Sequence, residues 1–127
     1  MEKLKQIPAA ELKVMQVIWT NPSPISTTQI KEVLDKTRPW KTGALQTLLN
    51  RLIDRGFLKA DMQGKSKIYM PLVSEDDYLA AESKSFLQQL SSNSITKLVA
   101  SLYDSKAISQ EDLHELNNYI DSVTKEQ

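Results

Sequence analysis

The spacing of apolar residues changes at Gly56, and this change constrains the fold more than any other feature of the sequence. Before Gly56, apolar residues recur at the i, i+3, i+4, i+7 and i+8 positions of a helix. They are Leu45, Leu48, Leu49, Leu52 and Ile53. After it, two runs at residues 57–62 and 67–72 have the length of strands. The sequence therefore predicts a helix from about Thr42 to Arg55, ended by a left-handed glycine and followed by a hairpin.

The predicted hairpin has a basic tip. Residues 63–66, Gln-Gly-Lys-Ser, separate the two runs and provide a turn glycine. In the second run one face is expected to be apolar and the other mixed. The apolar face is Ile68, Met70 and Leu72, and the other holds Lys67 and Tyr69. Pro71 lacks a backbone donor, which indicates an edge strand about to leave the sheet.

Two further helices are predicted before this pair of elements. Residues 10–19 have one broad apolar face, and Asn21-Pro22-Ser23-Pro24 ends that helix. Ile25 follows as a single extended apolar residue. Ser26 then opens a short helix, because its hydroxyl and the Gln29 side chain can form a capping box. The resulting order of helix, helix, helix and hairpin is typical of a winged helix-turn-helix.

Three more helices are predicted from residue 74 onward. Ser74 with Asp77 and Ser109 with Asp112 are capping pairs, and a Ser/Asn cluster at residues 91–94 divides the first helix from the second. Each helix has an apolar stripe that we expect to be buried. The stripes are Leu79, Phe86, Leu87 and Leu90; Ile95, Leu98, Val99, Leu102 and Tyr103; and Leu113, Leu116, Ile120 and Val123.

These three modest helices cannot easily bury their apolar faces alone, because small domains bury too little of their surface. Pairing with a second copy of the chain would cover them, which predicts a homodimer. The residues expected at the dimer contact are Leu79, Phe86, Leu87, Leu98, Leu102, Leu116 and Ile120. The sequence thus predicts a mainly α protein with a small β-hairpin wing, divided into a winged-helix domain over residues 1–73 and a helical dimerisation domain over residues 74–127.

The distribution of charge supports this division. The chain has 16 basic and 16 acidic residues, so its net charge is zero. Residues 1–72 hold 12 lysines and arginines against 6 acids, whereas residues 73–127 hold 4 against 10. A basic half joined to an acidic half indicates a part that binds a polyanion and a part with another task. Ordinary surface charge is the alternative interpretation.

Several classes of function are not expected. The chain has no cysteine, which excludes disulfides, thiolate metal sites and thiol catalysis and favours a reducing, cytoplasmic compartment. The segment Met1-Glu2-Lys3-Leu4-Lys5 lacks the apolar core of a signal peptide, and no apolar run could insert into a membrane. His114 is the only histidine and is a poor argument for a metal site. We expect no cofactor and no enzyme activity, since no nucleophile with a base and no phosphate-binding glycine loop is present.

The polar side of the helix at residues 42–55 is the candidate for reading DNA. A major groove about 12 Å wide admits a helix. Gln46 and Asn50 could pair with adenine, and Thr47 could offer its hydroxyl to a base or its methyl to thymine. The whole set of expected contacts to double-stranded DNA is Thr42, Gly43, Gln46, Thr47, Asn50 and Arg51 on the helix and Lys65 and Lys67 on the hairpin. A solvated helix surface is the alternative.

Other prominent side chains have structural interpretations. Arg51 and Arg55 are expected to contact phosphates or to form ion pairs within the protein. Trp19 and Trp40 are expected to pack in the core or at a domain seam. Tyr69 could pack on the hairpin or touch the DNA backbone, and packing is favoured.

The chain resembles the penicillinase-repressor family, the BlaI/MecI/CopY group of bacterial regulators. The residues that carry the resemblance are Val17-Ile18-Trp19, Thr47-Leu48-Leu49-Asn50-Arg51-Leu52, Gly56, Tyr69 with Pro71, and Lys84-Ser85-Phe86-Leu87. The Thr-Leu-Leu-Asn-Arg-Leu run is the specific part, and the resemblance spans nearly the whole chain. It implies a homodimeric repressor on palindromic operators, with the C-terminal helices forming the dimer.

Departures from the family pattern limit what carries over. Copper-responsive members use a C-terminal cysteine cluster, which this chain lacks. In antibiotic-resistance members a sensor protease cuts at an Asn-Phe dipeptide, and the matching positions here are Ser101-Leu102. Induction could still depend on a membrane sensor pathway, although this chain lacks the dipeptide at which that protease cuts. The family's Pro-Lys-Thr is Thr42-Gly43-Ala44 here, and Gln46 stands where a lysine is frequent, so we expect a different operator sequence.

Two hypotheses follow. The leading one is a transcriptional repressor that binds a palindromic operator as a homodimer. The alternative is a winged-helix module that binds another protein and no DNA, because a fold does not determine a function.

Overall fold

The computed structural model describes residues 6–90 and 94–125. The chain forms two compact units, an N-terminal unit over residues 1–85 and a C-terminal unit over residues 86–127, and the boundary falls within one helix. The predicted division at residues 73 and 74 stays a prediction. The first five residues and the predicted Ser/Asn break, apart from Ser94, lie outside the described residues.

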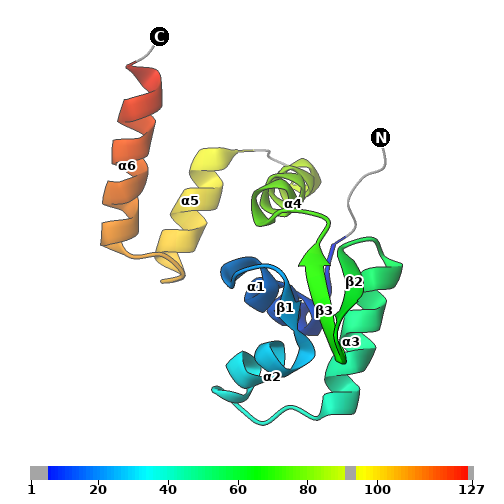
Figure 1. The fold of residues 1–127 in the computed structure, drawn as a ribbon. Helices are drawn as coiled ribbons and strands as arrows, with labels where there is room; N and C mark the ends of the chain where they lie inside the picture. Colours follow the sequence, from blue (N-terminus) through cyan, green and yellow to red (C-terminus); the bar gives the residue numbers. More distant parts are fainter. Residues whose placement is uncertain (1–5, 91–93, 126–127) are drawn as a thin grey trace. The chain divides into compact units, whose positions relative to one another are not determined.

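The N-terminal unit has the element order of a winged helix (Figure 1). Its elements are α1 (Ala9–Thr20), β1 (Ile25–Ser26), α2 (Thr27–Asp35), α3 (Thr42–Asp54), β2 (Leu58–Gln63), β3 (Ser66–Pro71) and the first part of α4 (Glu75–Gln89). The predicted helices and hairpin are therefore present. Their ends lie within one or two residues of the predicted ones.

The sheet corrects two predictions. It has three antiparallel strands in the order β1-β3-β2, so β3 is the central strand and not an edge. Pro71 is tolerated because β1 is only two residues long and pairs with Tyr69 and Ile68, which leaves Pro71 paired on the β2 side alone. The buried face of β3 is also the opposite of the one expected. Tyr69 is fully buried, whereas Leu72, just after the strand, is 58% exposed.

One hydrophobic core holds the N-terminal unit together. It contains side chains from the predicted apolar face of α3, together with residues of α1, α2 and the sheet. The fully or almost fully buried side chains include Val14, Met15, Ile18, Ile25, Ile30, Leu45, Leu49, Leu52, Phe57, Leu58 and Tyr69. The helix α3 is thus anchored along its whole length, and its other side is presented to solvent.

Local sequence signals set the ends of the helices around this core. Ser26 Oγ accepts a hydrogen bond from Gln29 N, and Gln29 Oε1 accepts one from Ser26 N, which is the predicted capping box. After α3, Gly56 has a φ of 85°, and Gly56 N and Phe57 N donate to the carbonyls of Ile53 and Leu52. This pair of bonds is a Schellman motif, which confirms the predicted glycine stop.

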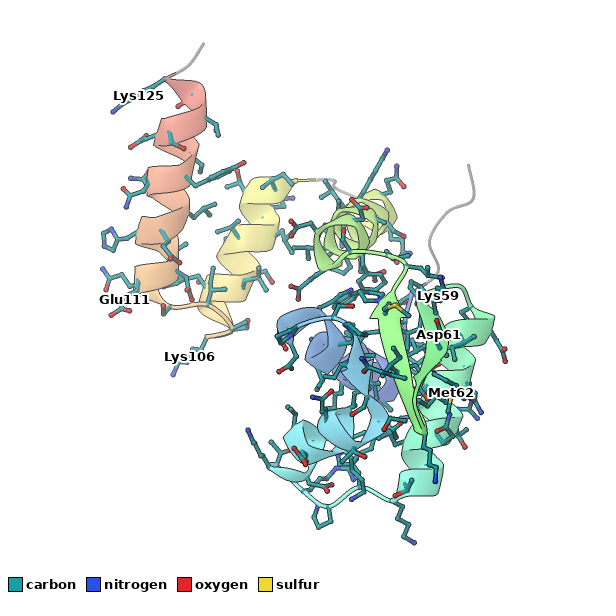
Figure 2. The ribbon with its side chains drawn as sticks, viewed as in Figure 1. Lys59, Asp61, Met62, Lys106, Glu111 and Lys125 are labelled. Carbon is teal, nitrogen blue, oxygen red and sulfur yellow. The ribbon has the colours of Figure 1, made fainter. Side chains whose placement is uncertain are left out.

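The C-terminal unit contains the end of α4, α5 (Ile95–Asp104) and α6 (Gln110–Thr124). Ser109 and Asp112 cap α6 as predicted. Lys106 reverses the chain after α5 with a φ of 65°, in a Schellman motif where glycine is usual, and its side chain points away from both helices (Figure 2). Neither α5 nor α6 has a buried residue. No described helix combines the length and apolar character needed to cross a membrane.

The predicted stripe of α4 is not buried within the chain. Leu79 is 60% exposed and Phe86 is 48% exposed, and the buried residue of this helix is Tyr78. Tyr78 packs its ring against Trp19 and Phe57, with ring centroids 5.7 and 6.0 Å away. Periodicity identified an apolar side of α4 but missed that the neighbouring aromatic residue is the one that meets the core.

Candidate nucleic-acid interface

The solvent side of α3 carries polar residues and no acid along most of its length. Gln46 is half-buried, and the other five predicted contact residues of this helix are exposed: Thr42, Gly43, Thr47, Asn50 and Arg51. The first acidic residue of the helix is Asp54, at its C-terminal end. A helix with this surface can approach the negative charge of a DNA groove without like-charge repulsion.

Three predicted contact residues are held by hydrogen bonds. Gln46 Nε2 donates to Asn50 Oδ1 at 3.0 Å and to the Tyr69 hydroxyl at 3.2 Å. Thr47 Oγ1 donates to the carbonyl of Gly43 at 3.0 Å. The Thr47 hydroxyl has thereby used its proton, so this side chain can offer an acceptor or its methyl group to a base. The structure brings Gln46 and Asn50 together as one polar cluster.

The hairpin lies alongside α3 (Figure 1). Its tip is the two-residue turn Gly64-Lys65, because Gln63 pairs with Ser66, and Gly64 has a φ of 63°. Lys65 and Lys67 are both exposed. The Lys67 ammonium lies 5.9 Å from the centre of the Tyr69 ring. The ring itself is fully buried, which confirms that Tyr69 packs.

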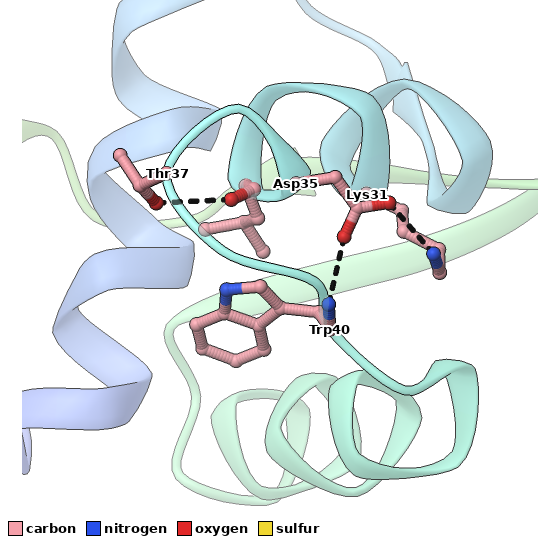
Figure 3. A network of polar contacts seen from close by, with 5 residues as sticks. Lys31, Asp35, Thr37 and Trp40 are labelled. Atoms are coloured by element: carbon pink, nitrogen blue, oxygen red, sulfur yellow. Dashed lines mark hydrogen bonds and ion pairs between the residues drawn. The ribbon is translucent and has the colours of Figure 1, made fainter.

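The turn between α2 and α3 is fixed by Asp35 (Figure 3). Its Oδ2 lies 2.7 Å from Lys31 Nζ, and its Oδ1 accepts a 2.8 Å hydrogen bond from the backbone N–H of Trp40. These two bonds hold the pKa of the Asp35 carboxyl below its ordinary value of 3.8, and the bond from Lys31 has the larger effect. Thr37 adds a hydrogen bond to the carbonyl of Leu34. The network sets where the helix α3 begins.

The same turn supplies two cations that the sequence-based site did not include. The Arg38 guanidinium carbon lies 4.5 Å from the centre of the Trp40 ring, and Lys41 is the N-cap residue of α3. Both are exposed beside the start of the candidate recognition helix. The clustering of Lys36, Arg38 and Lys41 within six residues was the available signal.

Arg55 has a different role from Arg51. Its guanidinium nitrogen lies 2.7 Å from both carboxylate oxygens of Glu11, a residue only 2% exposed. Of the two alternatives predicted for Arg55, the structure supports the internal ion pair. Glu11 was not predicted to be buried, although it shares a helical face with Met15 and Ile18. Among the described residues, Arg51 forms no ion pair and remains available on the surface.

Both tryptophans pack as predicted. Trp40 is buried in the core. Trp19 packs against the surface of the core, and its indole Nε1 donates to the carbonyl of Val73 at 2.9 Å.

Within the described residues no group of three or more His, Cys, Asp or Glu side chains could hold a metal ion. The polar surface of α3, the basic hairpin tip and the turn before α3 are therefore the groups that define the candidate interface.

Comparison with protein families shows where this arrangement belongs. The model of the penicillinase repressor family matches residues 7–122, which is most of the chain. The chain belongs to the penicillinase repressor family. This family relationship was expected from the Thr47–Leu52 run and is confirmed.

Individual relatives agree with this assignment. The penicillinase repressor of Bacillus licheniformis is 36% identical over 91% of this chain and 90% of its own length. The methicillin resistance regulatory protein MecI of Mammaliicoccus sciuri is 30% identical over 93% of this chain and 95% of its own. The solution structure of monomeric B. licheniformis BlaI in complex with the blaP half-operator is 42% identical, with a TM-score of 0.51, over 61% of this chain and 94% of that one. The winged-helix fold is thus shared with a family member seen on DNA.

Proposed function

We propose that the protein is a transcriptional repressor that binds a palindromic operator as a homodimer. The observation that carries the proposal is the polar, acid-free side of α3 beside a basic hairpin, in a unit 42% identical to a BlaI structure that contains a half-operator. A protein that acts on an operator is expected in the cytoplasm. The family to which the chain belongs is a repressor family, which favours this function over catalysis.

In this proposal α3 enters the major groove. Gln46, Thr47 and Asn50 contact base edges there, because amide side chains match adenine and a threonine methyl matches thymine. Thr42 and Gly43, at the start of the helix, lie close to the sugar-phosphate backbone beside the groove. Arg51 contacts a phosphate. The buried leucines on the other side of α3 keep the reading side chains in one orientation.

The hairpin contributes affinity with little sequence preference. Lys65 stands at the tip and Lys67 on β3, so both can neutralise phosphates next to the groove that α3 occupies. Each neutralised phosphate releases condensed counterions, and the binding constant then falls steeply with salt. The hairpin is therefore expected to position α3 on the duplex.

The homodimer is supported by the apolar surface of the C-terminal unit. Here α5 and α6 bury no residue, and a groove between them is lined largely by apolar side chains. Its lining residues are Ile95, Thr96, Val99, Ala100, Tyr103, Asp104, Leu113, Leu116, Tyr119 and Ile120. Two of the seven predicted dimer residues, Leu116 and Ile120, line it. A second copy bound here would give the assembly two α3 helices, one for each half of a palindromic operator.

Binding of the full chain to DNA tests the proposal. We expect wild-type protein to select one palindromic sequence from duplexes randomised over about 20 base pairs, two turns of DNA. Lys65→Ala should weaken binding to every duplex and lower the slope of log K against log salt by about one for each subunit of the dimer. Lys97→Ala, an equal loss of charge on α5, should leave that slope unchanged. Asn50→Ala should instead reduce the difference between the selected and unrelated duplexes.

Two results would contradict the proposal. If wild-type protein binds no duplex more tightly than bulk DNA, the protein is not a sequence-specific repressor, and the protein-interaction module becomes the better hypothesis. If Lys65→Ala and Asn50→Ala change binding in the same way, the separate roles of hairpin and helix are wrong.

A further inference from the structure

We propose that Tyr69 is a positioning residue that locks Gln46 and Asn50 into a single adenine-reading unit. The inference rests on the proposed DNA-binding function and goes beyond it. Tyr69 is a fully buried residue of the sheet, so its ring is not accessible to a base. It would act on sequence preference only through the side chain of Gln46.

The hydrogen bonds around Gln46 account for both protons of its amide nitrogen. One goes to Asn50 Oδ1 at 3.0 Å, and the other goes to the Tyr69 hydroxyl at 3.2 Å. Asn50 Oδ1, which can only accept, decides which end of the Gln46 amide faces inward, and the bond to the Tyr69 hydroxyl fixes where that amide lies. If Gln46 turned its oxygen toward Asn50 Oδ1, two acceptors would face each other and the first bond would be lost. Asn50 Oδ1 thus keeps Nε2 inward, and the Tyr69 hydroxyl holds the side chain in this position.

With Nε2 held inward, the two amides expose complementary atoms. Gln46 Oε1 and Asn50 Nδ2 have no hydrogen-bond partner within the described part of the chain. The pair therefore offers one free acceptor and one free donor. Adenine presents a donor at N6 and an acceptor at N7 on its major-groove edge, whereas guanine presents two acceptors. The cluster thus matches adenine, with Asn50 donating to N7 and Gln46 accepting from N6.

Tyr69 is suited to this role because it cannot move easily. It lies on the central strand, paired with Ile25 on one side and with Ala60 on the other, and none of its side chain is exposed. Lys67 lies over its ring from the same face of β3. The hydroxyl is therefore a fixed point of the sheet, and it connects the hairpin with the reading side of α3.

The test compares two tyrosine variants of the full chain on randomised duplexes of about 20 base pairs. Tyr69→Phe keeps the buried ring and removes the bond to Gln46. We expect a two- to tenfold loss of discrimination at one adenine in each half-site, the range for freeing one side chain at an interface. The slope with salt should not change. Tyr78→Phe is the matched control, because its hydroxyl accepts a buried hydrogen bond from Ile7 N away from α3. It should leave the selected sequence unchanged.

A double-mutant cycle separates positioning from general stabilisation. In Gln46→Met protein, which has no amide to hold, Tyr69→Phe should cause no further loss of discrimination. The inference is wrong if Tyr69→Phe selects the same bases with wild-type discrimination, if its effect persists undiminished in Gln46→Met protein, or if the position affected by Gln46→Met prefers guanine. Failure of wild-type protein to select any sequence would instead reject the proposed function.

Discussion

The two units of the chain differ in where their apolar side chains lie. In the N-terminal unit three leucines of α3 and three aromatic residues are buried: Leu45, Leu49, Leu52, Phe57, Tyr69 and Tyr78. In the C-terminal unit α5 and α6 have stripes just as regular, yet no residue of either helix is buried. The two units also differ in charge, since the basic residues are concentrated before residue 73.

Regular amphipathic spacing therefore does not by itself produce a core. The N-terminal unit closes its core because three helices pack with a sheet, so each apolar face finds a neighbour. Two helices of 10 and 15 residues have no third layer, and isolated helices of that length are marginal in water. We infer that the N-terminal unit is stable alone and that the C-terminal helices depend on a partner surface.

The largest expected effect comes from making the same substitution in both kinds of environment. Leu52→Ala removes a fully buried side chain of α3 and should lower the free energy of unfolding by about 2–5 kcal/mol. Leu72→Ala, at a position 58% exposed just after β3 and outside the predicted dimer contact, should change it by less than about 0.5 kcal/mol. Urea unfolding followed by tryptophan fluorescence measures this directly, because Trp19 and Trp40 both lie in the N-terminal unit.

Similar losses in the two variants would break the comparison. An equally large loss for Leu72→Ala would mean that this exposed side chain is covered in the folded protein. A small loss for Leu52→Ala would mean that the core of the N-terminal unit is not the source of its stability.

A smaller effect on stability, confined to the C-terminal unit, is expected from Ile120→Asp. The substitution puts a charge into the apolar groove between α5 and α6, where we propose that a second copy binds. The variant should sediment as a monomer at micromolar concentration, where wild-type protein should be a dimer. Because its short helices lose their partner, far-ultraviolet circular dichroism should also show a loss of helix. Tryptophan fluorescence should be unaffected.

Asn118→Asp provides the matched control on α6. It adds the same charge at an exposed polar position, which lies on nearly the opposite side of the helix from Ile120. It should remain dimeric. Wild-type protein that is monomeric at micromolar concentration, or an Ile120→Asp variant that still dimerises, would contradict the proposed dimer surface.

Local signals in the sequence predicted most of the N-terminal unit. The glycine stop at Gly56, the capping box at Ser26 and the leucine face of α3 each depend on residues close together in the chain, and each is present. The capping box at Ser109, in the C-terminal unit, is local in the same way and is also present. The positions on the solvent side of α3 followed from the same periodicity. Their exposure is confirmed for all but the half-buried Gln46, whereas their contacts with DNA stay predictions.

The features that sequence missed depend on contacts between distant elements. The strand β1 has two residues, too few to show any alternation, and its pairing with β3 decides that Tyr69 faces the core. Spacing indicates which residues share a face but not which face the core covers. This is why the wrong side of β3 was predicted to be buried, and why the contact of Tyr78 on α4 with the core was missed. The Arg55–Glu11 ion pair and the Gln46–Tyr69 bond join residues 44 and 23 positions apart, and no local pattern marks them.

The smallest change in the free energy of unfolding is expected when the ion pair of Asp35, in the N-terminal unit, is removed. The pKa of Asp35 is lowered, first by its bond with Lys31 and then by the Trp40 N–H. Its contribution to stability is therefore fully present above the carboxyl's ordinary pKa of 3.8 and is lost as the pH falls through the lower value of the folded state. Asp35→Asn should be slightly less stable than wild type at pH 6, and the difference should shrink progressively below about pH 4.

Urea unfolding of both proteins between pH 6 and the acid limit measures this convergence. Glu32→Gln controls for the loss of one negative charge on α2, since Glu32 is exposed and forms no ion pair among the described residues. Its difference from wild type should not follow the same course. A difference that does not shrink as the pH falls would contradict a contribution from the ion pair. If the two proteins do not differ at any pH in this range, Asp35 acts only as an acceptor for Trp40, a role that asparagine can also fill. The stability of the N-terminal unit would then rest on its core with no measurable share from this ion pair, which would sharpen the contrast with the C-terminal helices further.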